Sequence, residues 1–146
     1  MSLISVYIHI VWSTKFREKF LDTPELRTAV WNHILCNARA KEIHLDHVNG
    51  YSEHCHCLVS LKPTQNISEI VRLIKGESSR WINEQKLVKG HFRWQEEYFA
   101  ASVAQDHLDR VRKYIQNQEI HHTRETFDAE YDRFIKYHGF QGSENL

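Results

Sequence analysis

The stretch HCHCLVSL, residues 54–61, sets the architecture expected for this chain. It is an apolar run with two histidines, and successive side chains of a strand point to opposite faces. The two faces are His54, His56, Leu58 and Ser60 on one side, and Cys55, Cys57, Val59 and Leu61 on the other. We expect the cysteine face to pack beneath helices as small hydrophobic side chains. The two imidazoles then lie side by side on the opposite face of a sheet.

The rest of the chain supplies partners for this strand. Periodicity and end signals predict strands over residues 4–12, 43–51 and 99–103, and helices over residues 24–40, 67–82, 106–118 and 127–138. Asn49-Gly50 is expected to be the turn that joins the second and third strands. The order strand, helix, strand, strand, helix, strand predicts an α+β, ferredoxin-like (split βαβ) four-stranded antiparallel sheet with helices on one face, followed by C-terminal helices.

Length and composition are those of an ordinary globular protein. With 146 residues, 41% hydrophobic and 26% charged, we expect one domain over residues 1–146, whose C-terminal helical part is residues 104–146. No run of apolar residues is long enough for a membrane span, so we expect a soluble, cytoplasmic protein. Its three cysteines do not predict a disulfide framework.

The net charge of zero conceals an asymmetry. Residues 94–146 carry six basic and ten acidic side chains, so residues 1–93 carry thirteen basic and nine acidic ones. An anionic partner for the first part of the chain is therefore compatible with the composition.

His54 and His56 have the spacing that a metal ion requires from a rigid strand, because side chains i and i+2 project in parallel. Taken alone, the pair is more often two solvated polar residues. A structural zinc site that combines them with Cys55 and Cys57 is disfavoured, since these side chains point to the opposite face. Further along the chain, Tyr114 and Gln118 share a helix face at i and i+4. A helical tyrosine is usually a packing residue.

Several segments together resemble a known family. They are VWSTKFREKF (residues 11–20), EHCHCLVSL (53–61), VRLIKGESSRWINE (71–84), WQEEYFAASV (94–103), KYIQNQ (113–118) and NQEIHH (117–122). These segments resemble the single-tyrosine HUH transposases of small bacterial insertion sequences, and the related repeat-associated tyrosine transposases. Two departures stand out: Glu53 occupies a position that is often Asp, and residues 97–99 replace a segment that is commonly Gly-rich.

The resemblance implies an enzyme and a set of roles. A homodimer would bind single-stranded DNA hairpins at the ends of a mobile element, with active sites shared between subunits in some members. Tyr114 would attack a backbone phosphorus to form a 5′-phosphotyrosine link. His54, His56 and Gln118 would hold Mg²⁺ or Mn²⁺ over the scissile phosphate. The cationic side chains expected to meet DNA are Lys15, Arg17, Lys19, Lys62, Arg72, Lys75 and Arg80.

Two other classes of function remain open from the sequence. A ferredoxin-like sheet can bind single-stranded nucleic acid without any chemistry. A His-x-His metal site can also hydrolyse a substrate with activated water, without a protein–DNA adduct. Replacement of Tyr114 with Phe is expected to be silent in the binding module, whereas in a tyrosine transposase it abolishes the adduct and leaves binding nearly intact. The sequence shows no general base for Tyr114.

Overall fold

The computed structural model describes residues 2–139. The strands are β1 (Tyr7–Ser13), β2 (His44–Tyr51), β3 (His54–Ser60) and β4 (Phe99–Val103). The helices are α1 (Pro24–Ala40), α2 (Ile67–Glu84), α3 (Leu108–Gln116), α4 (Gln118–His121) and α5 (Phe127–His138), with short 3-10 turns η1 (Lys15–Arg17) and η2 (Gln105–His107). The expected order of elements is confirmed.

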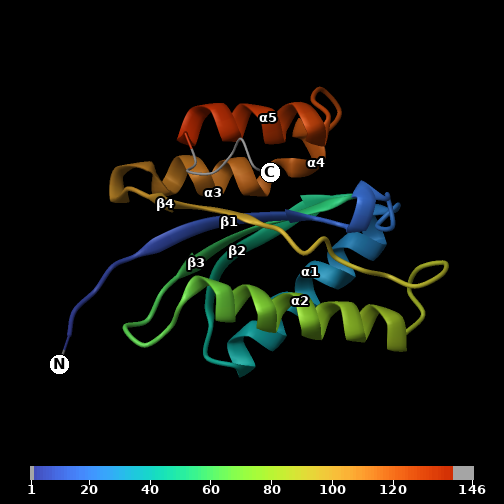
Figure 1. Cartoon of the computed structure of the whole chain (residues 1–146), viewed down its shortest axis with the longest axis horizontal. Coiled ribbons are helices and arrows are strands. Elements are labelled where there is room, and N and C mark those ends of the chain that lie inside the picture. The colour runs from blue at the N-terminus through green and yellow to red at the C-terminus, as the bar shows by residue number, and fades with distance from the viewer. Residues whose placement is uncertain (1, 140–146) are drawn as a thin grey trace.

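The four strands form one antiparallel sheet in the order β2-β3-β1-β4. Helices α1 and α2 cover one face, and α3, α4 and α5 lie over the other (Figure 1). This is the α+β, split βαβ arrangement that the sequence predicts. None of the helices in residues 2–139 combines the length and apolar character needed to cross a membrane.

The main core lies between the sheet and the pair α1 and α2. Cys55 and Cys57 are fully buried there, and Ile8, Ile10 and Trp12 of β1 join them. The alternation expected for residues 54–61 is therefore confirmed. Thr23 caps α1 and Asn66 caps α2 through side-chain oxygens that accept from backbone N–H groups, as the sequence signals indicate.

The turn of the β2–β3 hairpin is not where the sequence predicts it. Tyr51 pairs with His54, so the connection is Ser52-Glu53, and Asn49-Gly50 lies within β2. Glycine is required at position 50 for a different reason. A Cβ at Gly50 would lie 2.1 Å from the carbonyl oxygen of His54, so only glycine allows the two backbones to approach this closely.

Two other boundaries also differ from expectation. β1 begins at Tyr7 and not at residue 4, and the apolar side chains of Ile4 and Val6 remain exposed. The helix expected over residues 106–118 is divided by Asn117, so Gln118 begins α4. The amide nitrogen Nε2 of Gln118 still donates to the Tyr114 carbonyl across this break, at 3.3 Å. Tyr114 and Gln118 thus remain adjacent.

The C-terminal helices form their own cores against the histidine face of the sheet. Phe127 and Phe134 of α5 pack with Val11 and Phe99, and Ile115 of α3 packs with Leu58 and Leu108. Ion pairs also connect these helices to the rest of the fold, and two of them are bidentate. Arg112 of α3 forms a bidentate pair with Asp46 of β2, and the buried guanidinium of Arg27 on α1 forms another with Glu119 of α4.

Candidate active site

The two histidines of β3 are fully buried, and each is oriented by a second side chain. The Nδ1–H of His54 donates to Glu53 Oε1 at 2.8 Å, because a carboxylate can only accept. The Nδ1 of His56 lies 2.9 Å from Nε2 of His9 on β1. Both contacts engage the Nδ1 atoms, so the Nε2 atoms of His54 and His56 face the helices above the sheet. Outer-shell partners of this kind fix the orientation of metal-ligating histidines.

Gln118 and His122 approach the same point from α4 and the residue that follows it. The Oε1 atom of Gln118 lies 3.0 Å from His54 Nε2 and 3.0 Å from His122 Nε2. Gln118 is fully buried, and its amide nitrogen is engaged by the Tyr114 carbonyl. Its carbonyl oxygen is therefore directed at the histidines.

A carboxylate from α5 completes this group. Glu130 is fully buried, and its Oε1 atom lies 3.2 Å from His56 Nε2 and 3.4 Å from Nε2 of both His54 and His122. Burial alone would raise the pKa of Glu130, but its hydrogen bonds with His122 and His56 outweigh burial and hold that pKa well below the ordinary value. Glu130 is therefore ionised at neutral pH.

The hydroxyl of Tyr114 meets the other oxygen of the same carboxylate. Tyr114 donates to Glu130 Oε2, and Nη2 of Arg133 donates to the phenol oxygen at 3.1 Å. Burial and the negative charge of Glu130 raise the pKa of Tyr114 above its ordinary value. The tyrosine is thus held protonated, next to an acceptor for its proton.

The donor set suits a divalent cation. The Nε2 atom of His54 lies 3.0 Å from Gln118 Oε1 and 3.4 Å from Glu130 Oε1, so a nitrogen and two oxygens that can ligate a metal meet at one point. Burial lowers the pKa of His56 to about 4, so His56 is neutral. Nitrogen and oxygen ligand atoms of His54, His122 and Glu130 all lie within 4.8 Å of one another. Imidazole nitrogens and carboxylate or amide oxygens gathered in this way are ligands that a divalent cation accepts.

The structure brings together all four residues that the sequence singled out: His54, His56, Tyr114 and Gln118. Rings of His56 and Tyr114 lie 5.7 Å apart between centroids. The sequence reasoning missed His9, His122 and Glu130. His122 had a local signal, because it follows Gln118 by four residues, whereas the approach of Glu130 is a tertiary contact without a sequence signature.

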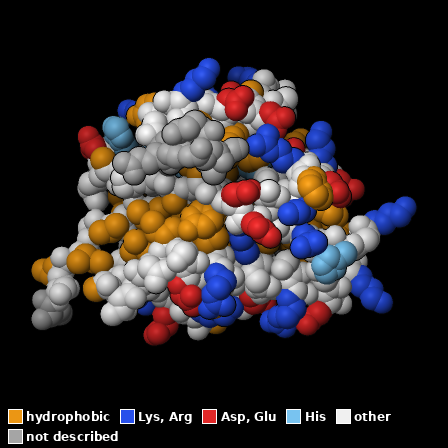
Figure 2. All heavy atoms as spheres, viewed as in Figure 1, with side chains coloured by type: hydrophobic (Ala, Val, Ile, Leu, Met, Phe, Trp, Pro, Cys, Tyr) orange, Lys and Arg blue, Asp and Glu red, His pale blue; other side chains and the backbone are white. Residues whose placement is uncertain are grey.

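The cationic side chains expected to bind DNA are distributed over three regions, because Lys62 lies at the end of the sheet opposite η1. Lys15 and Arg17 lie in η1, with Lys19 just after it and Lys62 after β3, and Arg17 forms an ion pair with Asp128 of α5. Arg72, Lys75 and Arg80 line an open groove of about 630 Å³ between α2 and residues 91–98. Basic and acidic side chains are intermixed on the face shown in Figure 2, where hydrophobic side chains gather towards one side.

Most of these cations already have acidic or backbone partners. Arg72 pairs with Glu69, and Arg80 pairs with Glu84. The ammonium group of Lys75 donates to the carbonyls of residues 95, 96 and 97, and burial lowers the pKa of Lys75 to about 8. Lys75 is therefore a structural cross-link between α2 and the segment that precedes β4.

Comparisons with known proteins place the chain in a family. Residues 2–118 match the family model described as "Transposase IS200 like". The ISDra2 transposase TnpA of Deinococcus radiodurans is 25% identical over 116 residues, which is 75% of this chain and 81% of that protein. The family match ends at Gln118, so His122 and Glu130 lie beyond it.

Two solved structures share the fold. A Deinococcus radiodurans R1 protein assigned as a transposase superimposes with a TM-score of 0.64 and 22% identity, over 80% of this chain and 93% of that one. The REP-associated tyrosine transposase bound to a REP hairpin superimposes with a TM-score of 0.61 and 16% identity, over 84% of this chain and 72% of that one. With a family match over most of its length, the chain belongs to the IS200-like transposases.

Proposed function

We propose that this protein cleaves and rejoins single-stranded DNA through a covalent link to Tyr114. The observation that carries the proposal is the shared carboxylate of Glu130, whose Oε1 faces the histidine pair while its Oε2 accepts from Tyr114. A nucleophile and a cation site are thereby joined in one buried cluster. Neither a plain binding module nor a hydrolase that uses water needs a tyrosine in that position.

His54, His56 and Gln118 would hold Mg²⁺ or Mn²⁺, with the Oε1 atom of Glu130 beside them. Imidazole, amide and carboxylate donors suit both ions, and availability would decide between them. When bound, the cation offsets negative charge that develops on the non-bridging oxygens of the scissile phosphate. Glu53 and His9 keep the two imidazoles in place for this task.

The chain's own residues perform the covalent step. The phenol oxygen of Tyr114 attacks phosphorus and forms a tyrosine O–P bond, while the bond from phosphorus to the 3′ oxygen breaks. Glu130 Oε2 takes the hydroxyl proton of Tyr114, and Arg133 stabilises the phenolate oxygen with its Nη2–H. The leaving 3′ oxygen acquires a proton and departs as a 3′-hydroxyl. Attack by a 3′-hydroxyl on the phosphotyrosine reverses these steps and rejoins a strand.

The substrate is proposed from the family and one structural relative. The REP-associated tyrosine transposase is described as bound to a REP hairpin, and it shares the fold of this chain. We accordingly propose single-stranded hairpin DNA from the flanks of the gene as the substrate, and a homodimer as the active assembly. In the chain described here, Tyr114 lies beside the histidines of its own subunit.

A denaturing gel tests the proposal. Hairpin DNA from the flanks of the gene, labelled at either end, is incubated with wild type or with Tyr114→Phe, with Mn²⁺ or with a chelator. We expect the 3′-end label to migrate with the protein and the 5′-end label to be released as a shorter strand, only with metal and only with Tyr114. Tyr137→Phe, an exposed tyrosine on α5, is the matched control. An adduct that persists in Tyr114→Phe, or hydrolysis without an adduct, would overturn the proposal.

A further inference from the structure

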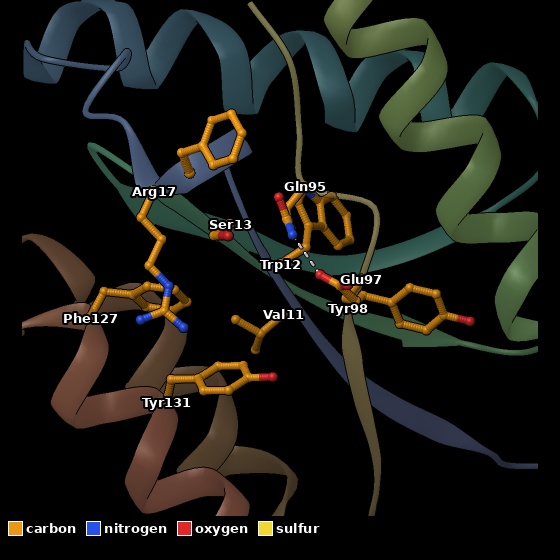
Figure 3. A pocket seen from close by; sticks show the side chains of 10 residues that line it. Val11, Trp12, Ser13, Arg17, Gln95, Glu97, Tyr98, Phe127 and Tyr131 are labelled. Atoms are coloured by element: carbon orange, nitrogen blue, oxygen red, sulfur yellow. Dashed lines mark hydrogen bonds between the residues drawn. The ribbon is translucent and has the colours of Figure 1, made fainter. Parts of the chain in front are cut away.

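A small cavity lies next to the active site, outside the catalytic cluster. It is enclosed by the end of β1, the turn η1, the segment before β4 and the first turn of α5, and has a volume of about 280 Å³ (Figure 3). This volume is at the lower end of the range for small-ligand pockets, about 300–1,000 Å³. Aromatic side chains form much of its wall, including Phe16, Tyr98, Phe127 and Tyr131.

Two walls of the cavity carry polar atoms without a partner. Among residues 2–139, three buried side-chain polar atoms lack a hydrogen bond, and two of them are Trp12 Nε1 and Gln95 Oε1, which belong to wall residues of this cavity. Buried polar groups are satisfied in the great majority of cases, so an unsatisfied pair at one cavity requires an explanation. One atom is a donor and the other an acceptor.

The rim of the cavity is held in a strained conformation. Phe16 and Arg17 adopt φ values of 56° and 55°, in the left-handed region that is unfavourable for residues other than glycine. The side chain of Phe16 is 80% exposed, so packing in the core does not account for its position. Arg17 reaches over the rings of Phe127 and Tyr131 at 5.2 and 5.1 Å (Figure 3). An exposed ring and a cation therefore flank the opening.

The cavity connects the active site to the groove on α2. The ring of Phe127, which forms one wall, stacks on His54 with 4.2 Å between centroids. Gln95 and Tyr98 line both this cavity and the groove of about 630 Å³ that contains Arg72 and Arg80. The cavity therefore lies between the groove and the ring that contacts the active-site histidine.

We propose that this cavity is a pocket for one unpaired nucleobase of the DNA strand, beside the phosphate that is cleaved. Aromatic rings and Arg17 offer stacking to any base. Trp12 Nε1 and Gln95 Oε1 have almost no accessible surface in this conformation, so a base would reach this donor and acceptor only after the two side chains turn towards the cavity. They then complement the acceptor and donor presented together by the edge of a base such as adenine. The pocket rests on the proposed function, since it assigns a position to the same DNA strand.

Binding to short single strands tests the pocket without any cleavage. The probes are a fluorescein-labelled oligothymidylate, oligoadenylate and oligocytidylate, and an oligonucleotide of equal length with abasic sites at its centre. We expect wild type to bind at least one base-bearing strand more tightly than the abasic strand. Phe16→Ala should weaken that binding about fivefold or more, because stacking contributes ~1–3 kcal/mol per base. Tyr137→Ala, which also removes an exposed aromatic ring, should leave it unchanged.

A second variant tests the hydrogen bonds. Gln95→Met keeps the length of the side chain but removes the unpaired oxygen, so the preference among the three base-bearing strands should flatten. Equal binding of abasic and base-bearing strands, or wild-type affinity in Phe16→Ala together with an unchanged base preference in Gln95→Met, would overturn the pocket. These outcomes are independent of the adduct at Tyr114. An adduct at Tyr114 with no effect of either Phe16→Ala or Gln95→Met rejects the pocket alone. A base-dependent effect of these variants without an adduct rejects the proposed chemistry alone.

Discussion

The carboxylate of Glu130 has contacts in two directions. One oxygen lies within 3.4 Å of the Nε2 atoms of three histidines, and the other accepts from the nucleophile proposed here, Tyr114. A carboxylate in the middle of a buried histidine cluster is stabilised by that cluster, which explains why its pKa is low despite burial. The arrangement makes Glu130 the residue on which both the cation site and the nucleophile depend.

Glu130→Gln should therefore slow formation of the DNA adduct about a hundredfold or more at saturating Mn²⁺, since loss of a general base typically costs a factor of 10²–10⁴. The measurement is a single-turnover time course on labelled hairpin DNA. Asp132→Asn removes an exposed carboxylate from the same helix and should leave the rate unchanged. A wild-type rate in Glu130→Gln would show that the proton of Tyr114 goes elsewhere.

The carboxylate of Glu53 accepts from Nδ1 of His54 and so orients the imidazole ring. A substitution at Glu53 should therefore change the affinity of the proposed cation site. We expect Glu53→Ala to weaken Mn²⁺ binding by a factor of about 10–100, the usual effect of removing an outer-shell partner. Isothermal titration calorimetry measures the affinity. Glu53→Asp retains a carboxylate and should recover most of it. If the alanine variant binds Mn²⁺ like wild type, Glu53 has no part in orienting the ligand.

The positions of individual site residues were predictable from the sequence where the geometry of a single strand or helix determines them. Strand alternation assigns His54 and His56 to one face, and helical spacing joins Tyr114 to Gln118 even though a break at Asn117 separates them. The role of Glu130 was not predictable, because it depends on how α5 docks against the histidine face. Nothing within the sequence of α5 distinguishes this glutamate from its acidic neighbours.

At the scale of elements, α5 is the part of the fold that covers the site. It is held by Phe127 and Phe134 and capped by Thr126, whose hydroxyl oxygen accepts from the N–H of Ala129. The proposed ligands His54, His56 and Gln118 beneath it are fully buried. Entry of a cation to these ligand atoms thus depends on how readily α5 opens.

Thr126→Ala should loosen this cover. Loss of an N-cap costs about 1 kcal/mol, which corresponds to a roughly fivefold increase in local opening. Hydrogen exchange measured by mass spectrometry should show faster exchange in α5 and little change in the sheet. Thr23→Ala removes the equivalent cap of α1, which packs in the main core, and should leave exchange of α5 as in wild type. Equal exchange of α5 in wild type and Thr126→Ala would contradict the assignment of Thr126 as its cap.

The pair Asp46–Arg112 connects β2 to α3 and should make stability depend on pH. Burial would raise the pKa of Asp46, but hydrogen bonds with Arg112 and His47 outweigh it and lower the native pKa below the ordinary 3.8. The stabilisation is thus fully present above pH 3.8 and lost as the pH falls through the lower native pKa.

Asp46→Asn should therefore lower the urea midpoint relative to wild type at neutral pH, with a difference that shrinks at pH below 3.8. Glu69→Gln removes an exposed ion pair on α2 and should have little effect at any pH. A difference between wild type and Asp46→Asn that is constant down to the lowest pH would show that the charge of Asp46 does not stabilise the fold.

Helices were more predictable than strand boundaries. Caps at Thr23 and Asn66 and the stop at Gly139 mark helix ends in the sequence, and the structure confirms them. Strand ends depend on pairing with other strands, which no local signal encodes. β1 consequently begins later than its apolar pattern suggests. Gly50 does not form the turn of the hairpin; it lies within β2, where it allows the backbones of β2 and β3 to approach closely.

At the scale of the whole molecule, the sheet separates the main hydrophobic core from the candidate active site. One face, with α1 and α2, carries the main core, and the other carries the histidines beneath the C-terminal helices (Figure 1). The family match covers the sheet, α1, α2, α3 and the residue that begins α4, whereas α5 lies outside it. The central claim is that these two parts together make Tyr114 a nucleophile towards DNA.

The most direct test of that claim is to identify the residue that carries the DNA. The protein is reacted with hairpin DNA and Mn²⁺, digested with trypsin and nuclease, and analysed by mass spectrometry. Cleavage after Lys113 and Arg124 yields a peptide of residues 114–124, which begins at Tyr114. We predict that this peptide alone retains nucleotide mass, localised to its tyrosine. Nucleotide mass on any other peptide, or DNA cleavage that leaves every peptide unmodified, would contradict the account.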